Sequence, residues 1–402
     1  MSKKSLVSFI VLFSLTFSTY SQNTSILGQE LSEELNAITT GVPFLTIAPD
    51  ARSGAMGDVG VASSPDANSI HWNSAKYAFI KDDVTLNLSY IPWLRSLVND
   101  INFQNISGSY RLNDNQVIGG SLMYFSLGSM DFTNEIGTTL VKDANPNEFS
   151  LDLAYALKLT KYMSGGIAFR YVHSNLTAGF SQPGSSPTKA GNAVAGDISF
   201  YYTKPMKLEK KDGEFSFGVN ISNLGNKISY STDAYYDDFL PANLRLGAAY
   251  KLELDDYNTI TAMFDINKLL VPTPPKFRSD TAADGSLVQY GLSDDVSVPV
   301  GVYQSFFDAP GGGTEKMHEL MYSVGMEYWY VNQFAIRGGY FDEHSTKGNR
   351  KYFTLGIGVK LNVLNFDFAY VIPTAGRQNP LANTLRFTLG INLKNTTNNT
   401  KK

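Results

Sequence analysis

The feature that most constrains this chain is a repeated alternation of apolar with small or polar residues, in stretches of about 8 to 14 residues from position 84 onward. In the clearest stretch, Phe149, Leu151, Leu153, Tyr155 and Leu157 alternate with Ser150, Asp152, Ala154, Ala156 and Lys158. A period of two is typical of a β-strand whose two faces meet different surroundings. One face here suits lipid and the other suits water, which is the pattern of a transmembrane β-barrel.

Fourteen stretches carry this alternation. They lie near 84–91, 104–112, 116–127, 147–160, 163–175, 194–205, 214–224, 243–254, 258–267, 318–330, 333–341, 351–361, 364–372 and 383–394. An even number of antiparallel strands brings both chain ends to the periplasmic side of an outer membrane. We therefore expect an all-β fold, a 14-stranded antiparallel transmembrane β-barrel.

The connections between the stretches alternate in length, which supports the same fold. Compact links at 113–115, 160–162, 255–257 and 331–332, and a longer one at 207–213, follow strands of even number, and extended links follow the odd ones. Outer-membrane barrels pair short periplasmic turns with long extracellular loops. A β-sandwich or a set of soluble β-domains is the alternative, and it predicts no such parity.

Charged residues inside the stretches share the polar register, as expected for a lumen. They are Asp152, Lys158, Arg170, Asp197, Arg245, Lys251, Asp265, Glu327, Arg337, Lys360, Asp367 and Arg386. A charge facing hydrocarbon would cost roughly 2 to 4 kcal/mol at the midplane. Both signs are present, which suits a lumen packed against a plug better than a selective pore.

The first 21 residues read as a secretory signal peptide. Lys3 and Lys4 precede an apolar stretch from Leu6 to Phe17, with Thr19 and Ser21 placed for cleavage after position 21. That stretch is shorter than the roughly 20 residues of a membrane-spanning helix. The chain has no cysteine, which excludes disulfides, a lipidated cysteine and cysteine-ligated metals. Its net charge of −4 argues against nucleic-acid binding.

Residues 22–82 lack the alternation and are expected to form an N-terminal periplasmic segment and a lumen plug, followed by the barrel at 83–394 and a periplasmic tail at 395–402. Small residues from Asp50 to Ala62 permit close backbone packing. A flexible tether is the alternative. The expected plug residues are Asp50, Arg52, Gly54, Met56, Gly57, Asp58, Trp72 and Asn73.

Two blocks resemble the long-chain fatty-acid transporter (FadL, OmpP1/TodX) superfamily. Asp50 to Ala62, continued by Ser64 to Ala75, is similar to the hatch of that superfamily, although Ser74 stands where proline is usual. Phe239 to Gly247 is similar to its link into a late strand. The resemblance implies a FadL-like barrel with an N-terminal hatch.

Three further blocks resemble the PorV family, also called LptO, of the type IX secretion system in Bacteroidetes. They are Ile38 to Gly57, Tyr90 to Leu94 and Asp265 to Pro275. The resemblance implies a non-enzymatic outer-membrane protein, without a cofactor, that binds secreted cargo through its C-terminal signal domain. It implies as partners an SprA-type translocon barrel, the PorU sortase with other attachment-complex proteins, and outer-membrane lipid.

Outer connections carry the candidate partner-binding residues. The longest connection, 268–316, contains Leu270, Pro272, Pro274, Tyr303, Phe306 and Phe307, and shorter ones contain Trp93, Tyr235, Tyr236 and Phe239. Exposed aromatic residues favour a protein-binding surface, with a lid over the barrel or an aromatic girdle as alternatives. A lumen of about fourteen strands is too narrow for folded cargo, so we expect cargo to bind outside it.

Other functions fit the sequence less well. A FadL-like importer of hydrophobic small molecules would need an apolar pocket and a lateral opening that sequence does not reveal. A lipid hydrolase would need a serine beside His173, but Ser174 is expected on the opposite face. The acidic pairs Asp237–Asp238 and Asp294–Asp295 lack the spaced oxygen ligands of a calcium loop. We expect no catalytic, metal or cofactor site.

Overall fold

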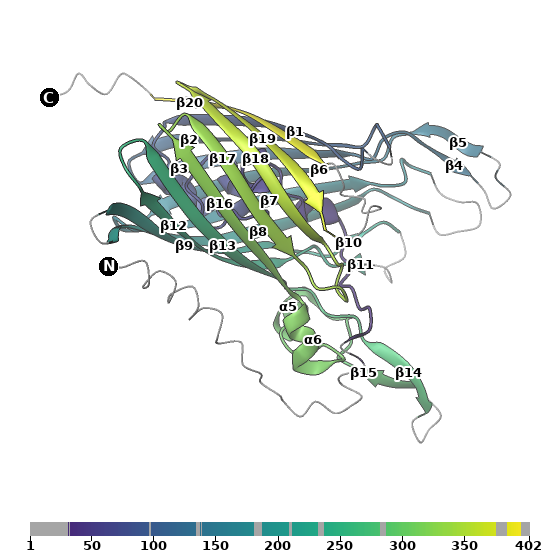
Figure 1. Cartoon of the computed structure of the whole chain (residues 1–402). Helices are drawn as coiled ribbons and strands as arrows, with labels where there is room; N and C mark the ends of the chain where they lie inside the picture. Colours follow the sequence, from purple (N-terminus) through teal and green to yellow (C-terminus); the bar gives the residue numbers. More distant parts are fainter. Residues whose placement is uncertain are drawn as a thin grey trace.

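The computed structural model describes residues 31 and 33–394, except 96–97, 134–136, 138, 181–186, 209–210, 232–236, 282–286 and 375–383. Fourteen strands form a closed antiparallel barrel in the order β1-β2-β3-β6-β7-β8-β9-β12-β13-β16-β17-β18-β19-β20 (Figure 1). The ring closes where β1 pairs with β20, with Leu88 opposite Leu389. The predicted 14-stranded barrel is therefore confirmed. The predicted signal peptide and the C-terminal tail lie outside the described residues.

The barrel strands fall within a few residues of the predicted stretches. They are β1 (Val84–Pro92), β2 (Asn102–Asn113), β3 (Gln116–Ser126), β6 (Asn147–Lys158), β7 (Met163–Asn175), β8 (Gly191–Leu208), β9 (Lys211–Gly225), β12 (Asn243–Glu253), β13 (Asn258–Leu269), β16 (Leu320–Tyr330), β17 (Phe334–Asp342), β18 (Lys351–Leu361), β19 (Leu364–Pro373) and β20 (Leu385–Leu393).

Burial follows the alternation along each strand. On β6, Leu153 is 63% exposed on the outer face while its neighbour Asp152 is 1% exposed in the lumen. The exposed apolar residues form the surface that lipid would cover, because a bilayer replaces water around the wall. The polar face is covered by the plug and by other lumen side chains.

The two ends of the barrel differ as the parity predicts. We call the end where β1 begins and β20 finishes the turn end; its links are short, such as the one between β2 and β3. The opposite, loop end carries small elements within its long connections (Figure 1). They are the hairpins β4 (Met130–Thr133) with β5 (Thr139–Ala144), β10 (Ile228–Ser229) with β11 (Asp237–Asp238) and β14 (Lys276–Thr281) with β15 (Leu287–Tyr290), and the helices α5 (Val298–Gln304) and α6 (Gly312–His318).

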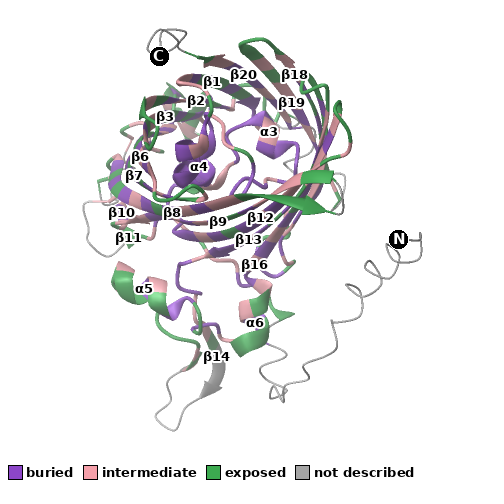
Figure 2. Ribbon diagram, turned by 90° about the vertical axis from the view of Figure 1, so that its left-hand side faces the viewer, coloured by how far each residue is buried: buried purple, intermediate pink, exposed green. Residues whose placement is uncertain are grey.

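The described residues between position 34 and β1 form four short helices. They are η1 (Pro43–Thr46), α3 (Ala51–Gly54), α4 (Ser69–Trp72) and η2 (Ser74–Phe79). Figure 2 shows α3 and α4 inside the ring of strands, with buried residues. Among the described residues, no helix has the length and hydropathy needed to cross a bilayer.

The described part of this segment begins at the loop end. The backbone N–H of Asn36 donates to the carbonyl of Thr346, and that of Gly41 donates to the carbonyl of Phe239, both in outer connections. The chain then passes through the lumen to reach β1 at the turn end. Carbonyls of the loop-end connections therefore provide the backbone partners of this extended stretch.

Strand glycines that face the lumen seat the plug against the wall. A Cβ on Gly339 would lie 2.1 Å from the backbone carbon of Met56, and one on Gly325 would lie 2.6 Å from the Met56 carbonyl oxygen. A strand glycine often marks a close approach of another backbone. The small residues of the plug and the glycines of the wall therefore form one contact surface.

Candidate functional site

Ion pairs join the plug to the inner wall at the turn end. The Arg52 guanidinium lies 2.9 Å from Asp66 of the plug and 2.9 Å from Glu327 of β16. Glu327 also accepts from Arg337 of β17 at 2.7 Å. Burial would lower the pKa of Arg52, but the Glu327 and Asp66 carboxylates reverse this effect and raise it. Arg52 therefore remains a cation that ties the plug to β16 and, through Glu327, to β17.

Two aspartates organise the core of the plug. Asp50 accepts from the backbone N–H of Ser53 at the start of α3 and from Trp72 Nε1 at the end of α4, both at 2.8 Å. Asp58 accepts from Arg386 and from the Tyr352 hydroxyl, both at 2.6 Å. The first aspartate thus joins the two helices, and the second joins the plug to β18 and β20.

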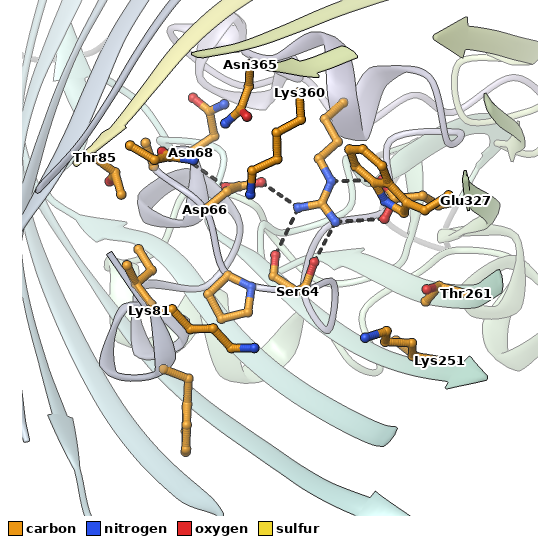
Figure 3. Close-up of a pocket in the computed structure, with 18 of the residues that line it drawn as sticks. Ser64, Asp66, Asn68, Lys81, Thr85, Lys251, Thr261, Glu327, Lys360 and Asn365 are labelled. Atoms are coloured by element: carbon orange, nitrogen blue, oxygen red, sulfur yellow. Dashed lines mark hydrogen bonds and ion pairs between the residues drawn. The ribbon is translucent and has the colours of Figure 1, made fainter. Parts of the chain in front are cut away.

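A polar cavity of about 460 Å³ lies between the plug and the turn end of the barrel. Figure 3 shows Lys81, Lys251 and Lys360 around it, together with Asp66 and Glu327. Arg52 reaches Ser64, Asp66 and Glu327 across this space. Cations and carboxylates are mixed along its wall, which suits a water-filled vestibule rather than a pocket for an apolar ligand.

The loop end is held together by a buried cluster of three lysines and three carboxylates, which we call the clasp. Its members are Lys268, Asp308, Glu315, Lys316, Glu319 and Lys347. Lys268 lies 2.8 Å and Lys316 lies 3.0 Å from Glu319. Burial alone would raise the pKa of Glu319, but the two lysines hold it below its ordinary value. The three positive and three negative charges balance. Their ion pairs hold the β13–β16 connection at the barrel mouth.

The N-terminal segment is bound to the clasp. The side-chain amide of Asn36 donates to Glu315 at 2.9 Å and to the carbonyl of Pro274 at 3.1 Å. Glu315 also accepts from Lys347 at 2.6 Å. The plug and the longest outer connection are therefore linked through shared hydrogen bonds.

Exposed apolar side chains gather on and beside α5 and α6, which lie beyond the loop end of the barrel (Figure 1). We call Val300, Tyr303, Phe306, Phe307 and Met317 the apolar patch; each is at least 48% exposed, and Tyr303 reaches 71%. The Tyr303 and Phe307 rings meet edge to face at 5.1 Å. Two predicted partner-binding residues, Tyr303 and Phe307, are thus in contact, and the third, Phe306, is exposed next to Phe307 in the chain.

The other predicted partner-binding residues are placed differently. Leu270 is buried, Pro272 is buried next to Gly301 of α5, and Pro274 is half-buried beside Asn36. Trp93 packs edge to face on Phe125 at the barrel mouth. These residues pack between the outer connections and the barrel mouth, so we do not assign them to a partner-binding surface.

The predicted partner-binding residue Phe239 contributes little to the apolar patch. Phe239 is half-buried, with the Lys227 ammonium 4.5 Å from its ring centre. Its ring also fills the space where a Cβ on Gly301 of α5 would lie. Tyr235 and Tyr236 lie outside the described residues.

All eight predicted plug residues lie inside the barrel. Besides the contacts above, Asn73 donates to the carbonyls of Val61 and Phe200, at 3.1 and 2.9 Å. Gly54 lies against the Arg386 side chain, and Gly57 has a φ of +68° next to the Tyr340 backbone. Sequence reasoning missed the wall glycines and Lys76, which is fully buried and donates to the Gly60 carbonyl at 2.7 Å.

The described residues contain no group of three or more histidine or acidic side chains placed to hold a metal ion. His173 meets Asn192, while the Ser174 hydroxyl donates to Glu148 on the opposite face of the wall. A serine nucleophile and its base must lie within hydrogen-bond reach. The separation of these two residues across the wall matches the prediction from the sequence.

Comparisons with solved structures return barrels of low sequence identity. The toluene transporter TbuX of Ralstonia pickettii is 12% identical, covering 86% of this chain and 98% of its own, with a TM-score of 0.43. The toluene transporter TodX of Pseudomonas putida is 12% identical. The match covers 89% of this chain and 98% of TodX, with a TM-score of 0.45. A FadL homologue of Pseudomonas aeruginosa is 10% identical. The match covers 89% of this chain and 98% of the homologue, with a TM-score of 0.39.

A family model provides the identification. No curated protein sequence matches the chain. The model described as "Type IX secretion system protein PorV" matches residues 30–276, which is more than half of the 402 residues and includes the plug and nine of the barrel strands. The chain therefore belongs to the PorV family of type IX secretion system proteins, and it is a non-enzymatic β-barrel of the outer membrane.

Proposed function

We propose that this barrel binds the C-terminal signal domain of secreted cargo at the translocon and carries the cargo to the sortase and attachment complex or to the cell surface. The apolar patch on α5 and α6 is the observation that carries the proposal. Tyr303, Phe306 and Phe307 are 71%, 50% and 53% exposed, so all three present aromatic surface to solvent. Aromatic residues are enriched where a few side chains provide most of a binding energy.

The route of the cargo follows from the filled lumen. The plug contacts the inner wall through Arg52, Asp58 and Asn73, and it occupies the space between the strands. Folded cargo would have to displace all of these contacts to pass through. We infer that cargo is bound on the outer face, while the barrel anchors it to the membrane.

The clasp supports the same role, because it holds the apolar patch in one orientation. Lys316 donates to the carbonyl of Ser305, next to Phe306, and pairs with Glu319 at the start of β16. A surface that is already ordered loses less conformational entropy when a partner binds. The proposed partners are an SprA-type translocon barrel, the cargo signal domain, and PorU with other attachment-complex proteins.

Affinity purification from native membranes tests this function. The full-length protein would carry a tag on its C-terminal tail, and the retained proteins would be identified by mass spectrometry. We expect a large translocon barrel, sortase components and proteins that share one C-terminal domain. The patch variant Tyr303→Ser/Phe306→Ser/Phe307→Ser should lose the cargo proteins.

A matched variant at the other end of the barrel provides the control. Met206→Ser/Leu208→Ser also removes exposed apolar side chains, but from the turn end of β8. It should retain the same proteins as the wild type. Recovery of the wild-type barrel without any secretion protein would contradict the proposed function.

A further inference from the structure

Two histidines stack against each other at the loop end. His318 is the last residue of α6, and His344 lies in the connection between β17 and β18. Their ring centres are 3.6 Å apart, and the ring planes differ by only 8°. Both side chains are half-buried. We call His318 and His344 the histidine pair.

The connection that carries His344 also holds the N-terminal segment and the clasp. The carbonyl of Thr346 accepts from the backbone N–H of Asn36 at 2.9 Å. Lys347 lies 2.6 Å from Glu315 of α6. The histidine pair joins the same connection to the end of the same helix. A movement of this connection away from α6 would therefore break the contacts of the N-terminal segment and of the clasp together.

The hydrogen bonds around the pair fit uncharged rings. Nδ1 of His344 accepts from the backbone N–H of Thr346 at 3.3 Å, which requires a lone pair on this nitrogen. Nδ1 of His318 is buried and has no hydrogen-bond partner within the described chain, so a proton there would be a buried charge without a partner. Burial, together with the neighbouring His318, lowers the pKa of His344. The closed arrangement thus belongs to the neutral pair.

Few charges around the pair are available to compensate added protons. The nearby charged groups come from three elements: Glu315, Lys316 and Glu319 on and next to α6, Asp342, Glu343, Lys347, Arg350 and Lys351 in and beside the β17–β18 connection, and Glu33 and Glu34 in the N-terminal segment. Among the described residues, ion pairs engage all of them apart from Glu33. Glu33 is exposed, where water and salt screen its charge.

We propose that the histidine pair is a pH-sensitive contact, which holds the β17–β18 connection against α6 when it is neutral and releases it when it is protonated. Two imidazolium rings stacked at this distance would repel each other, and the Thr346 N–H would lose its acceptor. Separated histidines would titrate near pH 6.5, so the open form takes up protons that the closed form excludes. The closed form is therefore favoured above about pH 6.5 and loses stability as the pH falls below this value. This opening does not depend on the proposed cargo binding.

A distance measurement between two spin labels tests the opening. The chain has no cysteine, so Met317→Cys on α6 and Ser345→Cys next to His344 accept the labels specifically, and both positions are exposed. Double electron–electron resonance would be recorded on the full-length protein in lipid nanodiscs at several pH values between about 8 and 5, a range in which ordinary carboxylates stay ionised. We expect one short distance at the upper end and a second, longer distance that becomes the major one at the lower end.

Variants assign the opening to the pair. His318→Phe/His344→Phe keeps two stacked rings without a titratable group and should retain the short distance over the whole range. His344→Gln removes one of the two charges and should lower the open fraction at the acidic end about twofold or more. His173→Phe is the matched control, because His173 lies on the outer wall beside Phe149, and it should open as the wild type does.

Every variant must first migrate as a folded barrel on a semi-native gel. A single short distance in the wild type at every pH would overturn the proposal. An opening that persists unchanged in both the phenylalanine double variant and His344→Gln would overturn it as well, since other groups would then control the movement.

Discussion

At the residue scale, single side chains connect the plug to several strands at once. Glu327 is 3% exposed and lies between Arg52 of the plug and Arg337 of the wall. Removal of one member of a buried ion-pair network leaves charges that neither water nor a partner can compensate. The contribution of such a residue is therefore much larger than that of an ion pair on the surface.

The variant Glu327→Gln should lower the free energy of unfolding by about 3–5 kcal/mol, because it leaves two buried guanidinium groups without their shared carboxylate. Urea titrations of the protein folded into phospholipid vesicles would measure this difference. Asp212→Asn breaks the exposed pair with Lys207 and should cause little change. Equal effects of the two substitutions would contradict the role assigned to Glu327.

The buried Lys76 predicts a pH dependence. Burial lowers its pKa from 10.5 to about 8, and its ammonium has neutral partners, the Gly60 carbonyl and the Ser63 hydroxyl. Between pH 8 and 10.5 the unfolded chain binds the proton more tightly than the folded one, so stability should rise with pH in this window, by up to about 3 kcal/mol. Urea titrations at intervals across the window would measure the rise. Lys76→Met should remove this part of the pH dependence, and an unchanged profile in that variant would contradict the assignment.

At the element scale, the fit between plug and wall depends on which face of a strand a glycine occupies. Gly338 and Gly339 are neighbours on β17. A Cβ on Gly338 would make only ordinary contacts, the nearest 3.7 Å from Leu355, whereas one on Gly339 would overlap the Met56 backbone. The two residues therefore form a natural test of how the plug is seated.

Gly339→Val should displace the plug and open the lumen to ions, while Gly338→Val should leave the barrel closed. Conductance of the purified protein in planar bilayers would detect the difference. Both variants must first migrate as folded barrels on a semi-native gel. Equal conductance of the two folded variants would show that this contact does not hold the plug.

The barrel elements could be predicted from the sequence because their signal is local. The alternation around Leu153 and Asp152 reports two different surroundings within a single strand, and the link lengths report the two ends. Helices α5 and α6 have only seven residues each, too few to show a period. Their positions depend on the clasp, whose members are far apart in the chain, so sequence did not reveal them.

At the scale of the whole molecule, the plug, the wall and the outer connections form one continuous structure. Asn36 contacts the clasp, Asp58 contacts β18 and β20, and Arg52 contacts β16. The motif from Asp50 to Asn73 predicted a plug. The path of the residues before it depends on the carbonyls of Thr346 and Phe239, which accept from Asn36 and Gly41 and lie far away in the chain. Trp93, Leu270 and Pro272 were predicted to be exposed from their residue types and their place in outer connections. Residue type alone does not distinguish an exposed residue of a connection from one that packs beneath it.

The central claim is that the loop-end surface of this barrel binds the signal domain of secreted cargo. The most direct measurement is the affinity of the purified barrel for a fluorescently labelled C-terminal signal domain of a secreted protein. We expect saturable binding by the wild type, a loss of about tenfold or more in Tyr303→Ser/Phe306→Ser/Phe307→Ser, and wild-type affinity in Met206→Ser/Leu208→Ser. Failure of the wild type to bind, or equal binding by the patch variant, would contradict the account.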